Sequence, residues 1–268
     1  MVVLPLPPLP PYNRLVRRAS RISAAAAALV FASLAYVYLT LPDVRPLREH
    51  PPETTAFMEL RAREAARAGK VAQRDQRWVA YDRISPNLTR AVVVSEDSRF
   101  WEHGGIDGEE IRESIRVNWE QRGLVRGAST ITQQLAKNLY LSPSKNPARK
   151  LRELLITRRL EAELSKRRIL ELYLNVIEWG DGVYGAEAAA RRYFGTSAAS
   201  LGRDQAALLA AAIPNPRVSN PADPTRYLRS RQRTIRSRMG GDRQAPAAEP
   251  PAVLPSRPIV PPPPAPAP

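Results

Sequence analysis

The 268-residue sequence contains no cysteine and only two histidines. The absence of cysteine excludes disulfide bonds and thiolate metal sites. His50 and His103 lie far apart in the chain and lack the spacing of paired metal ligands. The sequence therefore predicts no metal site and requires no cofactor, although it leaves a role for a divalent cation open.

Acidic residues are scarce relative to basic ones. The chain has 26 Asp and Glu against 41 Lys and Arg, a formal net charge of +15. Such an excess favours an anionic partner, which can be nucleic acid, anionic lipid or a phosphorylated substrate. Composition alone does not choose among the three.

Charge is absent from Ile22 to Pro42, a run of 21 residues. This is long enough to cross the roughly 30 Å hydrocarbon core of a bilayer as a helix. Arginines at 14, 17, 18 and 21 precede it, so the positive-inside rule predicts a cytoplasmic arm at 1–21, a transmembrane helix at 22–42 and an external remainder. A cleaved signal peptide and a buried soluble helix are the alternatives, but the length favours a retained anchor.

Few segments between residues 43 and 240 alternate with period two, so we expect a mainly α domain there. Capping residues and apolar spacing predict helices at about 55–68, from 107, 130–141, 146–164, from 165, 185–193 and 204–212. By contrast, residues 245–268 include eleven prolines and cannot form a packed core. The sequence therefore predicts a disordered tail over 241–268.

The stretch "SEDSRFWEHGG" brings acids, aromatics and a histidine together at the end of an apolar run, from Ser95 to Gly105. Its ordinary interpretation is a solvated helix start with Ser95 as the N-cap. The alternative interpretation is a functional loop at the edge of a buried segment. This stretch alone does not decide between them.

The helix that Thr130 begins has two distinct stripes. Ile131, Leu135 and Leu139 form an apolar one, whereas Gln134, Lys137 and Asn138 form a polar one. Uncharged amides beside a single lysine suit the wall of a cleft better than a solvated face, which would use Glu and Lys pairs. An ordinary polar face stays the alternative.

The next helix places Arg149, Lys150 and Glu153 within one turn. They form either a surface ion pair, worth under about 1 kcal/mol, or a cationic cluster for a phosphate group with a carboxylate among it. The motif alone leaves both open.

Five motifs in order give a specific resemblance that covers about residues 43–240. They are "EDSRFWEHGGID", "RGASTITQQLAKNLYL", "RKLRELLITRRLE", "SKRRILELYLN" and "AAARRYFG". Together they resemble the peptidoglycan glycosyltransferases, the membrane-anchored family that polymerises lipid II. The anchor, the "PPETTAFM" segment and the lack of a transpeptidase domain resemble its monofunctional biosynthetic branch. The resemblance implies a lysozyme-like, mainly helical domain with a smaller membrane-facing lobe.

The resemblance also implies roles for individual residues. Glu96 would be the general base of an inverting transfer that uses no nucleotide, and Glu153 the second essential glutamate. The other matching positions fall into three groups. These are the basic residues Lys137, Arg149 and Lys150 at the leaving pyrophosphate, Gln134, Ser129, Thr130 and Asn138 in the cleft wall, and Asp97, Phe100 and His103 in the loop around Glu96.

The implied partners are lipid II, the growing glycan strand, membrane lipid, and cell-wall synthesis or division proteins, with no nucleic acid. The implied location is the cytoplasmic (inner) membrane, with one span and an external catalytic domain. Two alternatives stay open. They are a lysozyme-like enzyme that cleaves peptidoglycan and a non-catalytic, membrane-anchored scaffold of the cell-wall machinery.

Overall fold

The computed structural model describes residues 12–123, 127–142 and 146–240, and the predicted tail at 241–268 lies outside them, as does the start of the predicted cytoplasmic arm. Helices dominate the described residues, which confirms the mainly α fold class. The α-helices are α1 (Tyr12–Leu39), α2 (Ala56–Arg67), α3 (Pro86–Glu96), α4 (Gly108–Glu120), α5 (Ile131–Tyr140), α6 (Pro147–Glu163), α7 (Lys166–Val176), α8 (Ala186–Phe194), α9 (Arg203–Ala212) and α10 (Arg226–Arg238). Short 3-10 segments lie at Arg45–Arg48, Tyr81–Arg83 and Ala198–Ser200.

Three short strands form one small sheet. They are β1 (Asp75–Gln76), β2 (Glu178–Gly180) and β3 (Val183–Tyr184), in the order β1-β3-β2. β3 runs parallel to β1 and antiparallel to β2. The β2–β3 turn needs glycine at Gly182, whose φ is +70°, because an added Cβ would lie 2.8 Å from the backbone oxygen of Gln73. Strands of two or three residues are too short to show alternation, so the sequence did not predict them.

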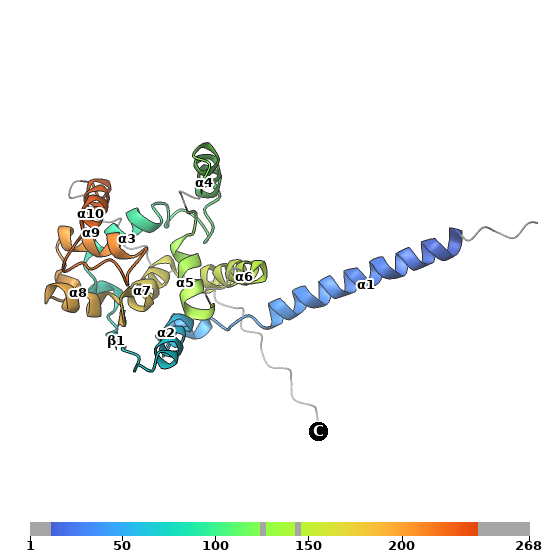
Figure 1. Cartoon of the computed structure of the whole chain (residues 1–268), viewed down its shortest axis with the longest axis horizontal. Coiled ribbons are helices and arrows are strands. Elements are labelled where there is room, and N and C mark those ends of the chain that lie inside the picture. Colours follow the sequence, from blue (N-terminus) through green and yellow to red (C-terminus); the bar gives the residue numbers. More distant parts are fainter. Residues whose placement is uncertain (1–11, 124–126, 143–145, 241–268) are drawn as a thin grey trace, which may run out of the picture.

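Two groups of helices build the core. α9 packs between α3 and α10, and α5 packs against α6 and α7 (Figure 1). Every residue from Ala206 to Ala212 of α9 is buried, and most are alanines that let neighbouring helices approach closely. Ile131, Leu135 and Leu139 of α5 are buried too, which confirms the predicted apolar stripe.

The interpretation of Ser95 as a helix N-cap is wrong. α3 begins ten residues earlier, where the Ser85 hydroxyl accepts from the backbone N–H of Asn87 and Pro86 takes the first helical position. The helix then runs through the apolar stretch and ends at Glu96. The acidic pair therefore lies at the C-terminal end of a buried helix.

Helix α1 extends away from the other helices (Figure 1). Its segment Val16–Leu39 is long and apolar enough to cross a membrane, and none of its apolar window is buried against the rest of the described chain. A buried soluble helix, one of the predicted alternatives, is thereby contradicted. The helix itself begins at Tyr12, within the segment predicted as a cytoplasmic arm.

Two arginines of α6 hold the end of α1, and we call them the arginine clasp. Arg152 donates to the carbonyl oxygen of Thr40 at 2.9 Å and to its hydroxyl at 2.8 Å. Arg159 donates to the carbonyl oxygens of Tyr38, Leu41 and Pro42, each at 3.4 Å. The acceptors lie in the last turn of α1 and in the residues just after it, where backbone carbonyl groups lack further helical N–H donors. The anchor therefore joins the body through α6.

Helix α4 lies apart from the main group of helices (Figure 1). The Asp107 carboxylate caps it by accepting from the backbone N–H groups of Glu109 and Glu110. Ile115 and Trp119 share one face of this helix, and they are 64% and 84% exposed. The structure thus leaves an apolar helix face uncovered by the described residues.

Candidate active site

Glu96 lies where α3 ends and faces α5. Its Oε2 accepts a hydrogen bond from the Gln134 side-chain amide at 2.9 Å. Burial raises the pKa of Glu96, while the bond from Gln134 and the positive charges of Arg231 and Lys137 act against that rise. A carboxylate with a raised pKa is suited to accept a proton near neutral pH.

Helix α5 supplies Gln134 and Lys137 from the part of its surface that is not fully buried. A complete capping box starts this helix: Thr130 accepts from the Gln133 N–H, and the Gln133 side chain accepts from the Thr130 N–H. Burial lowers the pKa of Lys137. The Lys137 ammonium lies 5.8 Å from the centre of the Phe57 ring, which belongs to α2.

Helix α6 carries the Glu153 cluster, which consists of Arg149, Lys150 and Glu153. Asn146 caps this helix and Pro147 takes its first position, as the sequence predicts. Arg149 contacts Glu153 at 2.7 Å and Lys150 contacts it at 2.5 Å. The Glu153 side chain is only 5% exposed, so this is not an ordinary surface ion pair. One buried carboxylate aligns two cations.

Lys137 connects the Glu153 cluster with Glu96. The charges that act on its pKa are those of Glu153, Arg149 and Lys150 from α6 and of Glu96 from α3. The two carboxylates hold the ammonium in its charged form against burial, whereas the two cations oppose them. The structure therefore brings the predicted base, the predicted basic residues and the second glutamate into one electrostatic site.

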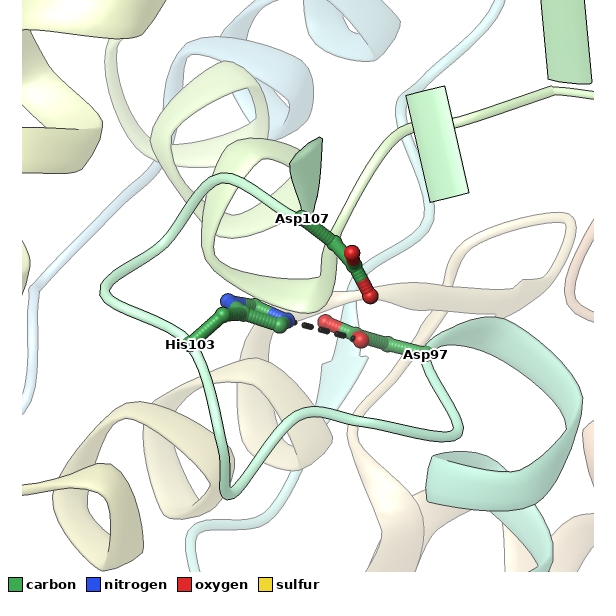
Figure 2. Close-up of side chains that lie close together, drawn as sticks. All are labelled: Asp97, His103 and Asp107. Atoms are coloured by element: carbon green, nitrogen blue, oxygen red, sulfur yellow. Dashed lines mark hydrogen bonds and ion pairs between the residues drawn. The ribbon is translucent and has the colours of Figure 1, made fainter. Parts of the chain in front are cut away.

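The loop after Glu96 is fixed by the loop brace, which consists of Asp97, His103 and Asp107 (Figure 2). His103 Nδ1 accepts from the Gly105 N–H at 3.1 Å, so its Nε2 carries the proton that is donated to Asp97 Oδ1 at 2.9 Å. Asp97 Oδ2 accepts from the backbone N–H of Ile131, the first residue of α5, at 3.0 Å. The brace thus ties the loop to the start of α5.

Ligand atoms of the loop brace lie within 4.8 Å of one another, a spacing that a metal ion could use. However, these atoms already take part in hydrogen bonds within the protein. Both nitrogens of His103 and both oxygens of Asp97 are engaged, and Asp107 Oδ1 caps α4. A metal would have to break several of these bonds, so the donor set fits a structural brace and not a metal centre.

The remaining predicted residues differ in their burial and in their hydrogen bonds. Phe100 is fully buried, with the Lys166 ammonium 4.4 Å from its ring centre. The Thr130 hydroxyl donates to the Gly105 carbonyl at 2.7 Å, and the Asn138 amide donates to the backbone oxygen of Gln134 at 2.8 Å. Both therefore support the backbone around the site. Ser129 is exposed just before α5.

Sequence reasoning missed three residues of the site. The Tyr173 hydroxyl of α7 contacts Gln134 Oε1 at 2.8 Å, and with Glu96 and Gln134 it makes up what we call the Glu96 cluster. Phe57 lies against Lys137, and the charge of Arg231 from α10 acts on Glu96. Phe57 and Tyr173 each lie within a motif quoted above, but nothing in their spacing indicates these contacts.

A cavity of about 370 Å³ lies elsewhere, between α2 and the β2–β3 turn. Four of its charged residues form ion pairs within the lining: Arg217 contacts Asp181 at 3.2 Å, and Arg61 contacts Glu64 at 2.8 Å. None of the predicted site residues lines it. The cavity is therefore not the site that the sequence predicts.

Comparison with known proteins identifies the family of the chain. The family model described as "Transglycosylase" matches residues 63–240. A biosynthetic peptidoglycan transglycosylase of Chromobacterium violaceum is 48% identical over 213 residues, which are 80% of this chain and 93% of that protein. Proteins of the same name from Thiobacillus denitrificans and Nitrosospira multiformis are 56% identical over 169 residues (63% of this chain, 73% of that protein) and 49% identical over 188 residues (70% and 82%).

The match includes α3, α5 and α6, which carry the predicted base, Lys137 and the Glu153 cluster. Its extent and the identity of the relatives decide the family. The resemblance stated from the sequence motifs is confirmed, and so is the lysozyme-like, mainly helical fold that it implied. The chain belongs to the transglycosylase family, and it is a peptidoglycan glycosyltransferase of bacterial cell-wall synthesis.

Proposed function

We propose that Glu96 is the general base in the polymerisation of lipid II. It takes the proton of the 4-hydroxyl on the acceptor's GlcNAc, and that oxygen attacks C1 of the donor's MurNAc. The bond from C1 to the pyrophosphate breaks, and undecaprenyl pyrophosphate leaves with the electron pair. The α-linked donor becomes a β-1,4 linkage, so the anomeric centre inverts.

The environment of Glu96 supports this role. Within residues 12–123, 127–142 and 146–240, its hydrogen bond engages Oε2, and Oε1 is left to accept the proton. Burial raises its pKa, which makes it a stronger base, while the positive charges of Arg231 and Lys137 act against the rise. A base positioned in this way typically contributes about 10²–10⁴-fold to the rate.

The cations of the Glu153 cluster support departure of the pyrophosphate. Negative charge grows on the leaving group as the bond breaks, and preorganised cations stabilise it in the transition state. Arg149 suits a phosphate because its planar guanidinium can donate two parallel hydrogen bonds. Glu153 holds Arg149 and Lys150 in place before substrate arrives.

The single observation that carries this proposal is the position of Lys137. This residue interacts electrostatically both with Glu96 and with the Glu153 cluster. A lysozyme-like hydrolase uses two carboxylates that flank the scissile bond. Here the second carboxylate is engaged by two cations, which suits a pyrophosphate leaving group better than a water nucleophile.

We further propose that α1 anchors residues 43–240 on the outer face of the cytoplasmic membrane, with the N-terminus inside. The arginines before the apolar span support this orientation. The exposed apolar face of α4, with Ile115 and Trp119, suits the predicted membrane-facing lobe. Cell-wall synthesis and division proteins stay predicted partners.

The direct test is incubation of the purified full chain with labelled lipid II in detergent. We expect glycan polymer and free undecaprenyl pyrophosphate from the native chain, and neither from Glu96→Gln. Finished glycan added alone should stay intact, and its breakdown would favour a hydrolase. A cytoplasmic reporter fused after residue 60 should be inactive, and its activity would contradict the proposed orientation.

A further inference from the structure

We infer that Tyr173 is a positioning residue for the reaction: its hydroxyl fixes the Gln134 amide in the orientation that donates to Glu96. The inference rests on Glu96 being the base. It concerns a series of hydrogen bonds that links three helices. Tyr173 of α7 bonds to Gln134 of α5, and Gln134 bonds to Glu96 at the end of α3.

The direction of each hydrogen bond follows from the donor and acceptor chemistry. Gln134 Oε1 can only accept, so the Tyr173 hydroxyl donates to it at 2.8 Å. The Gln134 Nε2 then faces Glu96 and donates to Oε2 at 2.9 Å. Every bond in this series favours the ionised form of Glu96, which is the form that a base needs.

Rotating the Gln134 amide by half a turn would reverse this preference. Oε1 would then face Glu96, which could be bonded only if the carboxyl group carried a proton. The Tyr173 hydroxyl would lose its acceptor, and the residue is fully buried. A buried O–H without an acceptor is costly, so Tyr173 opposes the rotation.

Tyr173 is suited to act as a permanent donor. Burial raises the pKa of its hydroxyl well above the ordinary value, with the charges of Glu96 and Asp97 acting in the same direction. The proton therefore stays on Tyr173 throughout the pH range of catalysis. The charged groups that face Glu96 from neighbouring elements are Arg231, Lys137 and Asp97, and none of them changes in a Tyr173 variant.

The chain offers a matched control in Tyr184. This residue is also buried, but its hydroxyl has no hydrogen-bond partner in the described part of the chain. Tyr184→Phe and Tyr173→Phe each remove one buried oxygen and keep the ring. Only Tyr173→Phe removes a hydroxyl that donates a hydrogen bond to Gln134.

The experiment compares Tyr173→Phe, Tyr184→Phe, Gln134→Ala and the double variant Tyr173→Phe/Gln134→Ala with the native full chain in the lipid II assay, between pH 5 and 9. We expect Tyr173→Phe to lower kcat about threefold to tenfold near neutral pH with KM nearly unchanged. The acidic limb of its pH–rate profile should move to higher pH, because the free amide can stabilise protonated Glu96. Tyr184→Phe should match the native chain.

The double variant should be no slower than Gln134→Ala, because the two residues act through one contact. ¹³C-NMR titration of the Glu96 carboxyl should show a higher pKa in Tyr173→Phe, a readout that requires no turnover. An unmoved Glu96 titration and acidic limb, or fully additive losses, would overturn the inference. Full activity in Glu96→Gln would instead overturn the base assignment, so the two failures are distinguishable.

Discussion

The Glu96 cluster and the Glu153 cluster surround their carboxylates in different ways. Glu96 accepts its hydrogen bond from a neutral amide that a neutral tyrosine orients, and among the residues that the structure describes no cation contacts it directly. Glu153 is more deeply buried than Glu96, and it contacts two cations. The first arrangement keeps a carboxylate reactive toward a proton, whereas the second uses a carboxylate to align cations. The proposed roles therefore follow from the charge of the group that contacts each carboxylate, a neutral amide for Glu96 and two cations for Glu153.

The largest expected effect comes from Glu96→Gln, which removes the proton acceptor but keeps the shape. Turnover of lipid II should fall by at least about 10²-fold. Because the folded-state pKa of Glu96 is raised, its ionisation weakens the fold as the pH rises from the unfolded-state pKa to the folded-state pKa. The variant should therefore melt at a higher temperature than the native chain at pH 8, and a lower melting temperature would contradict the assigned shift.

Lys137→Ala tests the residue whose pKa responds to charges in both clusters. It should lower the rate by about 10²-fold, since one preorganised cation is lost where negative charge develops. Unlike Glu96→Gln, it should also weaken the binding of inorganic pyrophosphate, measured by calorimetry. Equal weakening by both variants would mean that Glu96 only organises the site, and Glu153 would become the candidate base.

Glu153→Gln tests whether Glu153 acts by aligning the cations Arg149 and Lys150. The loss of one charge-assisted contact should slow turnover roughly tenfold. The negative charge of Glu153 raises the pKa of Lys137, so its removal should lower that pKa further. The alkaline limb of the pH–rate profile should move to lower pH, whereas a shift confined to the acidic limb would mean that Glu153 titrates as the base.

Asp97→Asn should have the smallest effect on chemistry and act mainly on stability. Its amide nitrogen would face either the His103 Nε2–H or the Ile131 N–H, leaving one buried donor without an acceptor. The free energy of unfolding in urea should fall by about 1–3 kcal/mol. Asp223→Asn, at an exposed position, serves as the control and should stay within about 0.5 kcal/mol of the native chain.

Local signals predicted much of this fold, because they depend on neighbours in sequence. Thr55, Asp107, Asn146 and Ser165 each accept from the helix that they were expected to cap. α10 escaped prediction because its two buried residues, Leu228 and Ile235, are sparse among arginines.

In the candidate site, too, contacts within one helix could be predicted from the sequence, whereas contacts between helices could not. The Glu153 cluster lies within one helical turn, so its contacts follow from spacing alone. The contact from Tyr173 to Gln134 joins α7 to α5 across 39 positions, and no periodicity indicates which face of one helix meets which face of the other. The role of Glu96 came only from resemblance, and its environment came only from the structure.

With α1 as the proposed membrane anchor, the arginine clasp would fix the distance between the bilayer and the Glu153 cluster. Arg152 grips the end of the anchor, and Arg149 lies three positions earlier on the same helix, about 4.5 Å along its axis at 1.5 Å per residue. A lipid-borne diphosphate can reach its cations while its tail stays in the membrane. Lengthening the anchor by one helical turn would move the arginine clasp and the Glu153 cluster together, by about 5.4 Å along the axis of α1.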